Sequence, residues 1–186
     1  MISTCGPRRA TRLFPSILSA VLPWGAFFVV LAATLPGTAS PADVYFSPDE
    51  GIRRHILHAI RDSRQQIDVA VYQITSTELA KALVAAKERG VRVRVLTDQE
   101  KATSGGPAIR ILREKGVQVR SLGVSEQSLM HHKFAVFDGR TAATGSYNWT
   151  NTAERANYEN LVLFDDRAVV ARFTREFQRL WQDAKD

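Results

Sequence analysis

Cysteine is almost absent from this chain of 186 residues, since Cys5 is the only one and it lies within the first 42 positions. The rest of the chain therefore contains no disulfide and no thiol catalyst. It also lacks any cluster of histidine and cysteine at metal-ligand spacing. Repeats of solenoid period and low-complexity segments are missing, which excludes repeat proteins and disordered chains. The remaining composition, 45% hydrophobic and 24% charged, is that of an ordinary globular domain.

Acidic residues are absent from positions 1–42, where Arg8, Arg9 and Arg12 are the only charges. An apolar run follows over 13–35, and then a stretch of small residues over 37–42. Basic, apolar, then small is the order of a secretory signal peptide. We therefore expect 1–42 to be a cleaved leader of a periplasmic or secreted protein, and 43–186 to form one domain. The apolar run is also long enough to cross a bilayer, so a membrane anchor over 13–35 is the alternative.

Much of the positive charge belongs to this leader. The whole chain carries a formal net charge of +6, with 25 basic and 19 acidic residues. Without the three leader arginines, 22 basic residues face 19 acidic ones and the net charge falls to +3. This mild excess suits an anionic partner.

Hydrophobic periodicity in 43–186 predicts strands at 43–46, 66–74, 91–97 and 117–121, with helices at 47–62, 75–89 and 107–115 between them. The first helix is expected to begin with a capping box formed by Ser47 and Glu50. Further strands are expected at 132–137, 141–144 and 158–164, with a hairpin turn at Asp138-Gly139 and a closing helix at 166–182. The order favours an α/β fold, a three-layer α-β-α sandwich around a mixed, largely parallel sheet.

One stretch carries chemistry, and it reads H-x-K-x4-D-x6-G-S-x-N from His131 onward. Side chains alternate along a strand, so His131 and Lys133 share one face and His132 points to the other. Lys133 can neutralise a phosphate oxygen, and His131 can attack phosphorus or move a proton. Ser146 and Asn148 are again two apart and can bind the same phosphate, while Gly145 lets the backbone come close.

These residues resemble the HKD signature of the phospholipase D superfamily, and the resemblance extends over essentially all of 43–186. The matching positions are His131, Lys133, Asp138, Gly145, Ser146 and Asn148. Glu159 matches the acidic position that follows the motif in the small bacterial members. The chain is most similar to the Nuc-type bacterial endonucleases, and next to the mitochondrial cardiolipin hydrolases.

The resemblance implies hydrolysis in two steps, in which one histidine attacks the phosphodiester and a second protonates the leaving oxygen. It implies catalytic roles for His131, Lys133, Asp138 and Glu159, with Glu159 expected to orient the His131 ring. The motif occurs once, and one imidazole cannot both attack and protonate. We therefore expect a homodimer with the active site on its two-fold axis. No metal or other cofactor is expected, because Lys133 and its symmetry mate supply positive charge.

The leading functional hypothesis is a metal-independent endonuclease that cleaves DNA or RNA without sequence preference. A phospholipase acting on cardiolipin is the first alternative, and it gains weight if the leader stays as a membrane anchor. A catalytically silent nucleic-acid-binding module is the second. For two further features the sequence is compatible with either a functional or a purely structural role. The loop from Lys101 to Pro107 either borders the cleft or is ordinary surface, and Trp149 either stacks on substrate or packs in the core.

Overall fold

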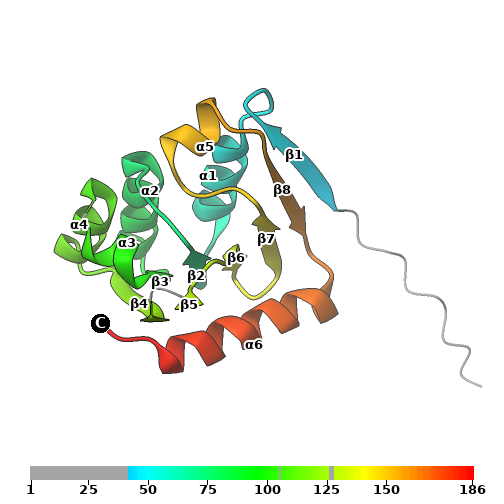
Figure 1. Ribbon diagram of the computed structural model, residues 1–186. Coiled ribbons are helices and arrows are strands. Elements are labelled where there is room, and N and C mark those ends of the chain that lie inside the picture. The colour runs from blue at the N-terminus through cyan, green and yellow to red at the C-terminus, as the bar shows by residue number, and fades with distance from the viewer. Residues whose placement is uncertain (1–41, 105, 126–127) are drawn as a thin grey trace, which may run out of the picture. The chain divides into compact units, whose positions relative to one another are not determined.

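The computed structural model describes residues 42–104, 106–125 and 128–186, and a mixed β-sheet runs through this part of the chain (Figure 1). Its strands follow the spatial order β1-β8-β7-β6-β2-β3-β4-β5. Their bounds are β1 Asp43–Ser47, β2 Gln66–Val71, β3 Arg92–Asp98, β4 Gln118–Ser125, β5 Ser128–Leu129, β6 Lys133–Phe137, β7 Thr141–Gly145 and β8 Glu159–Phe164.

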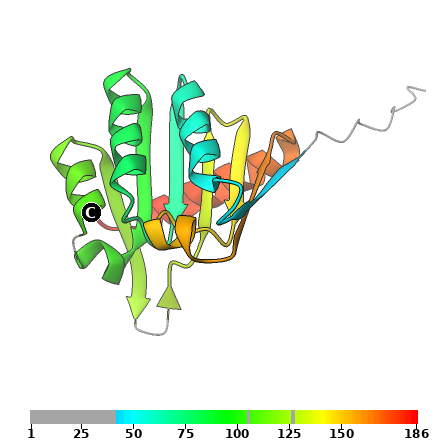
Figure 2. The same ribbon diagram turned by 90° about the horizontal axis from the view of Figure 1, so that it is seen from above.

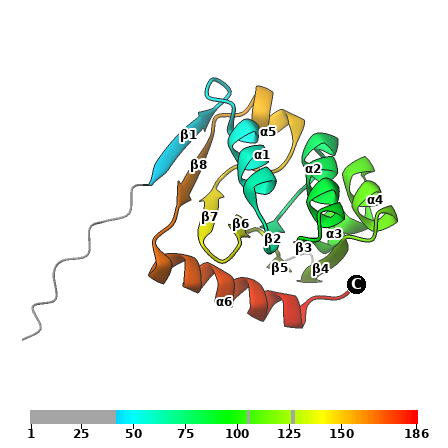
Figure 3. The ribbon, with the colours of Figure 1, turned by 180° about the vertical axis from the view of Figure 1, so that it is seen from behind.

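Helices cover both faces of the sheet, as Figures 1 and 2 show. Their bounds are α1 Ile52–Asp62, α2 Thr77–Glu88, α3 Gln99–Thr103, α4 Pro107–Glu114, α5 Asn151–Arg155 and α6 Arg167–Asp183. Figure 3 shows α6 alone along one face, with α1, α2 and α4 on the other. The α/β class and the three layers are those that the sequence predicts.

A separate hydrophobic cluster packs between the sheet and the helices on each of its two faces. On one face, Ile56 of α1 and Leu83 of α2 pack over inward-facing strand residues such as Val69. On the other, Phe177 of α6 packs over strand residues such as Phe134. Burial of one such side chain contributes about 1.5–3 kcal/mol relative to exposure. Both faces of the central strands are therefore largely apolar, and the one charged side chain of β2, Asp68, is buried and pairs with Arg94.

The sheet is mixed, as predicted, but parallel pairs do not predominate in it. Only β2 with β3 and β3 with β4 are parallel. The five other pairings are antiparallel, including β1 with β8 and β2 with β6. The prediction placed β1 in the series of βαβ units. The structure instead places it at the sheet edge beside β8, a pairing between segments more than 100 residues apart.

The predicted capping box before the first helix is wrong. Helix α1 begins at Ile52, later than Ser47 would require. The Glu50 carboxylate accepts a hydrogen bond from the Phe46 amide at 2.8 Å, and closes a turn there. The Ser47 hydroxyl donates to the carbonyl of Ala153 at 2.8 Å, so it fastens β1 to α5. Helices α3 and α5 and the short strand β5 were not expected from the sequence.

The predicted leader falls on residues outside those that the structure describes. Across 42–104, 106–125 and 128–186, the search for a helix with the length and hydropathy of a membrane span finds none.

Candidate functional site at one edge of the sheet

Strand pairing brings the motif together at one edge of the sheet. Lys133 at the start of β6 pairs with Val71 at the end of β2. Gly145 at the end of β7 pairs with Leu161 near the start of β8. Because these neighbours are antiparallel, the start of β6 and the end of β7 lie side by side. His131, Lys133, Ser146 and Glu159 therefore share this edge.

His131 and Lys133 are in direct contact. The Lys133 Nζ atom lies 3.2 Å from Nδ1 and 3.3 Å from Nε2 of the His131 ring, and donates to the His131 carbonyl at 2.9 Å. The ring centroid of His131 lies 4.7 Å from that of Tyr72. Burial lowers the pKa of Lys133, and the negative charge of Glu159 partly opposes this shift. His131 itself is exposed.

His132 points to the other face, as alternation predicts. Its Nε2 atom lies 3.7 Å from a carboxylate oxygen of Glu176 on α6. Its ring packs edge-on to Phe134, with centroids 5.5 Å apart. The doubled histidine therefore does not place two imidazoles on one phosphate within this chain.

Glu159 is held by neighbours other than His131. The Ser146 hydroxyl donates to one of its carboxylate oxygens, and the Asn157 side-chain amide donates to the other at 2.9 Å. The Ser146 hydroxyl oxygen in turn accepts a hydrogen bond from the backbone amide of Asn160 at 3.1 Å. The predicted contact in which Glu159 orients the His131 ring is not among these bonds. Glu159 instead orients the Ser146 hydroxyl, and acts on Lys133 through its charge.

Gly145 allows a close approach, but of the chain's own backbone. A Cβ atom at this position would overlap the Asn160 carbonyl group, 2.8 Å from its carbon. Two residues beyond Ser146, the Oδ1 atom of Asn148 is buried, and no described group hydrogen-bonds to it. Trp149 is buried and bridges to Ile74, so the packing role holds and the stacking role does not.

Asp138 lies away from the other motif residues within one chain, and its predicted catalytic role stays a prediction. It follows the last residue of β6, roughly 16 Å along the strand from Lys133 at about 3.3 Å per residue. Its carboxylate accepts backbone hydrogen bonds from Arg64, Gln65 and Gln66 at 2.7–2.9 Å. The residue has φ 53°, as the tight hairpin turn requires. Asp138 therefore fastens the β6–β7 turn to the start of β2.

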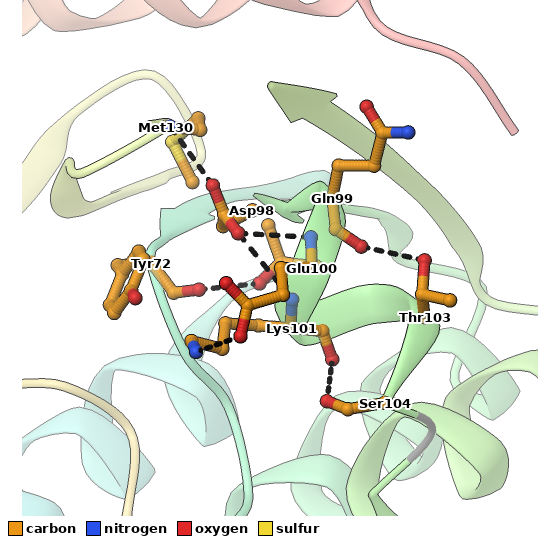
Figure 4. A network of polar contacts seen from close by, with 9 residues as sticks. Tyr72, Asp98, Gln99, Glu100, Lys101, Thr103, Ser104 and Met130 are labelled. Atoms are coloured by element: carbon orange, nitrogen blue, oxygen red, sulfur yellow. Dashed lines mark hydrogen bonds and ion pairs between the residues drawn. The ribbon is translucent and has the colours of Figure 1, made fainter. Parts of the chain in front are cut away.

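Asp98 is not among the site residues predicted from the sequence, yet this buried carboxylate supports the site (Figure 4). One of its oxygens accepts from the amides of Glu100 and Lys101 at 3.0 and 3.4 Å, and so caps α3. The other accepts from the amide of Met130 at 3.2 Å. An aspartate between a strand and a helix is a readable capping signal. Its hydrogen bond from the Met130 amide joins residues 32 positions apart, and no pattern near either residue in the sequence predicts it.

Two cavities adjoin the site. One of about 630 Å³ is lined by His131, His132 and apolar residues that include Leu129 and Leu180. The other, of about 660 Å³, runs along α6 from His132 and Phe134, past Arg172, Arg175 and Arg179. In the described ranges no three histidine, cysteine or acidic side chains gather as metal ligands would.

The arrangement can do defined chemistry. The contacts of the Lys133 ammonium with the two ring nitrogens of His131, at 3.2 and 3.3 Å, place a positive charge beside the imidazole. A phosphate placed between them would meet a nucleophile and a positive charge. Ser146, an exposed hydroxyl on the same edge, supplies a further hydrogen-bonding group.

Comparison with known proteins gives consistent results. The family model described as "Cardiolipin synthase, PLD-like domain" matches residues 56–181. Mitochondrial cardiolipin hydrolase of Xenopus tropicalis is 41% identical over 135 residues, which cover 73% of this chain and 63% of that protein. The protein of the same name from Mus musculus is 34% identical over 179 residues, 95% of this chain and 77% of the relative. The crystal structure of Nuc, a phospholipase D family member from Salmonella typhimurium, superposes with a TM-score of 0.71 at 31% identity, covering 78% of this chain and 97% of Nuc.

Proposed function

The chain belongs to the phospholipase D superfamily, and from this premise we propose that it is a phosphodiesterase whose substrate is cardiolipin. The observation that carries the proposal is the contact of the His131 ring with the Lys133 ammonium at an exposed edge that also presents Ser146. The names of relatives that match up to 95% of the chain favour cardiolipin over the nucleic acid that the sequence first suggested.

The surroundings of the site also suit a lipid. Leu129, two residues before His131, is 50% exposed, and Tyr158, directly before Glu159, is 92% exposed. Phe46, which pairs with Asn160 across β1 and β8, is 54% exposed. Exposed apolar and aromatic side chains around a polar site fit the boundary between headgroups and acyl chains. A purely polar substrate would leave them without a use.

The proposed reaction has two steps. A His131 ring nitrogen attacks the phosphorus of one phosphodiester while Lys133 neutralises a non-bridging oxygen, and the bond to the bridging glycerol oxygen breaks. A second imidazole protonates that oxygen, which releases phosphatidylglycerol. The second imidazole then takes a proton from water, the hydroxide displaces the histidine, and phosphatidic acid leaves. We expect this to proceed in EDTA, since the positive charge comes from lysine.

The second imidazole has to come from another copy of the chain. His132 lies on the α6 face, and His55 and His58 both lie on α1, where His55 stacks on Tyr45 with ring centroids 3.5 Å apart. A two-fold axis beside His131 would place the same residue of a partner on the far side of the phosphate. We therefore propose a homodimer with one shared site.

Nucleic-acid hydrolysis is the second candidate, and one observation favours it. The cavity along α6 carries Arg172, Arg175 and Arg179 and begins at His132, next to the site. A row of arginines can follow a polyanionic backbone. The similarity to Nuc is compatible with it.

The test is a substrate panel in excess EDTA with wild-type protein and His131→Ala. Vesicles containing cardiolipin should yield phosphatidic acid and phosphatidylglycerol with the wild type only. Degradation of plasmid DNA beside intact cardiolipin would replace the proposal with the second candidate. Binding of DNA without hydrolysis of either substrate would favour a silent binding module. Export by the leader, or anchoring through 13–35, stays a separate prediction.

A further inference from the structure

The Tyr72 ring lies close to two ammonium groups at the candidate site. The Nζ atom of Lys133 lies 5.3 Å from the centroid of the Tyr72 ring, and that of Lys101 lies 5.5 Å from it. The two nitrogens are thus no farther apart than the sum of these distances. Lys133 belongs to the motif, whereas Lys101 on α3 has no role in the reaction described above. Figure 4 shows Lys101 extending from α3 beside Tyr72.

Lys101 is held in place by the same carboxylate that supports His131. Asp98, which is 2% exposed, accepts from the Lys101 amide with one oxygen and from the Met130 amide with the other. The Thr97 hydroxyl donates to the Tyr72 carbonyl at 2.9 Å and ties the same strand end to the end of β2. The two lysines therefore stand on one fixed framework, although they are 32 positions apart in the chain.

We propose that Lys101 binds the second phosphate of the substrate while Lys133 binds the phosphate that is cleaved. The inference rests on the proposed function, because cardiolipin carries two phosphates joined by one glycerol. The bridge between the two phosphorus atoms consists of three carbons and two oxygens. With a hydrogen bond at either end, it can reach from one ammonium to the other.

The present partner of Lys101 does not prevent this. Its ammonium contacts Glu100 at 2.8 Å, but the Glu100 side chain is 73% exposed, and an exposed ion pair is worth little. Glu100 first, and then Tyr72, raise the pKa of Lys101, so the side chain stays cationic. A phosphate that replaces the Glu100 contact would also reduce the repulsion between the two lysines beside the Tyr72 ring.

The inference is tested by competition between lipids with one and two phosphates. Vesicles of phosphatidylcholine would contain equal mole fractions of cardiolipin and phosphatidylglycerol with different acyl chains, so that the products differ in mass. The ratio of products gives the ratio of kcat/KM for the two lipids. Lys101→Gln should lower the preference for cardiolipin about 10-fold, the loss of one hydrogen bond between charged groups. Glu100→Gln, which removes the competing carboxylate, should raise it.

The matched control is Lys115→Gln. Lys115 is exposed and precedes the start of β4, whereas Lys101 follows the end of β3. Since β3 and β4 are parallel, Lys115 lies at the opposite edge of the sheet. Thermal unfolding of all three variants should match the wild type, which excludes loss of α3 as the cause.

The outcomes separate the two proposals. A wild type that hydrolyses neither lipid overturns the proposed function and the inference with it. The inference alone is overturned if the wild type is active and Lys101→Gln keeps the same preference for cardiolipin. It is also overturned if Lys101→Gln hydrolyses both lipids more slowly by the same factor. A variant that loses DNA cleavage and keeps its preference for cardiolipin would assign Lys101 to a nucleic-acid strand instead.

Discussion

The Lys133 ammonium nitrogen lies 3.2 Å from Nδ1 of His131, and Lys133 is the first residue of β6, where it pairs with Val71 of β2. This contact holds the imidazole ring beside a positive charge. A phosphodiester that enters the site would take the ammonium as its counterion and expose the ring nitrogen to phosphorus. We therefore propose that the pair is a preformed phosphate site that lacks only a general acid.

Substitution of each of the two adjacent histidines by alanine should have unequal effects on kcat. His131→Ala removes the proposed nucleophile and should reduce kcat at least 1,000-fold, on the order of the loss seen when a catalytic nucleophile is deleted. His132→Ala removes a 3.7 Å contact with Glu176 and the edge-on packing against Phe134, both on the α6 face, and should keep kcat within a few-fold. Turnover of cardiolipin by each purified variant is the measurement. A larger loss in His132→Ala would refute the assignment of faces.

Asp138→Asn should lower stability at neutral pH and leave turnover unchanged. Burial alone would raise the pKa of Asp138, but backbone donors from Gln66, Arg64 and Gln65 outweigh it and the pKa is lowered. A lowered pKa means that the ionised carboxylate stabilises the fold above its unfolded value of about 3.9, and that this contribution is lost as the pH falls through the folded pKa. Asparagine tolerates the positive φ, so the turn should survive.

The measurement for Asp138 is denaturant unfolding at pH 7 and in the acid range, beside kcat. We expect Asp138→Asn to lose about 1 kcal/mol at pH 7 and to show a smaller further loss in acid than the wild type. Asp165→Asn, at an exposed position between β8 and α6, is the matched control and should change neither quantity. A large drop in kcat with unchanged stability would restore the catalytic role of Asp138.

Glu159→Gln should move the alkaline limit of activity to lower pH. Burial lowers the pKa of Lys133 and the charge of Glu159 raises it, so removal of that charge lowers the pKa further. Lys133 then loses its proton, and with it the positive charge that phosphate binding needs, at a lower pH. The profile of kcat/KM against pH is the measurement. Glu114→Gln on α4 is the control, and a Glu159→Gln profile reduced in height without displacement would contradict the electrostatic role.

Local rules predicted most of the elements and part of the site. Alternation along a strand separated His131 from His132, and the Asp138-Gly139 pair marked a hairpin turn. The bounds of α6 were predicted within a residue, because Asp166 caps it with a bond to the Val169 amide at 2.9 Å. In each of these cases the determining contact lies within a few positions of the residue concerned.

The errors arose where distant segments meet. Nothing near Asp138 in sequence shows that its carboxylate will accept amides from residues more than 70 positions earlier. The position of Glu159 beside Ser146 depends on the pairing of β7 with β8. The buried Arg94–Asp68 pair, bonded at 2.8 Å across β2 and β3, is likewise a product of register. Sequence spacing supplied the residues of the site, and long-range pairing decided which of them meet.

The central claim is that two chains share one site, and a mixed dimer tests it most directly. Wild-type and His131→Ala chains with different tags would be co-expressed and the heterodimer isolated by two affinity steps, with a wild-type/His132→Ala heterodimer as control. We predict that the His131→Ala heterodimer turns over cardiolipin no faster than the His131→Ala homodimer, while the control stays active. Half of the wild-type activity in the His131→Ala heterodimer, or full activity from a monomeric wild type, would contradict the account.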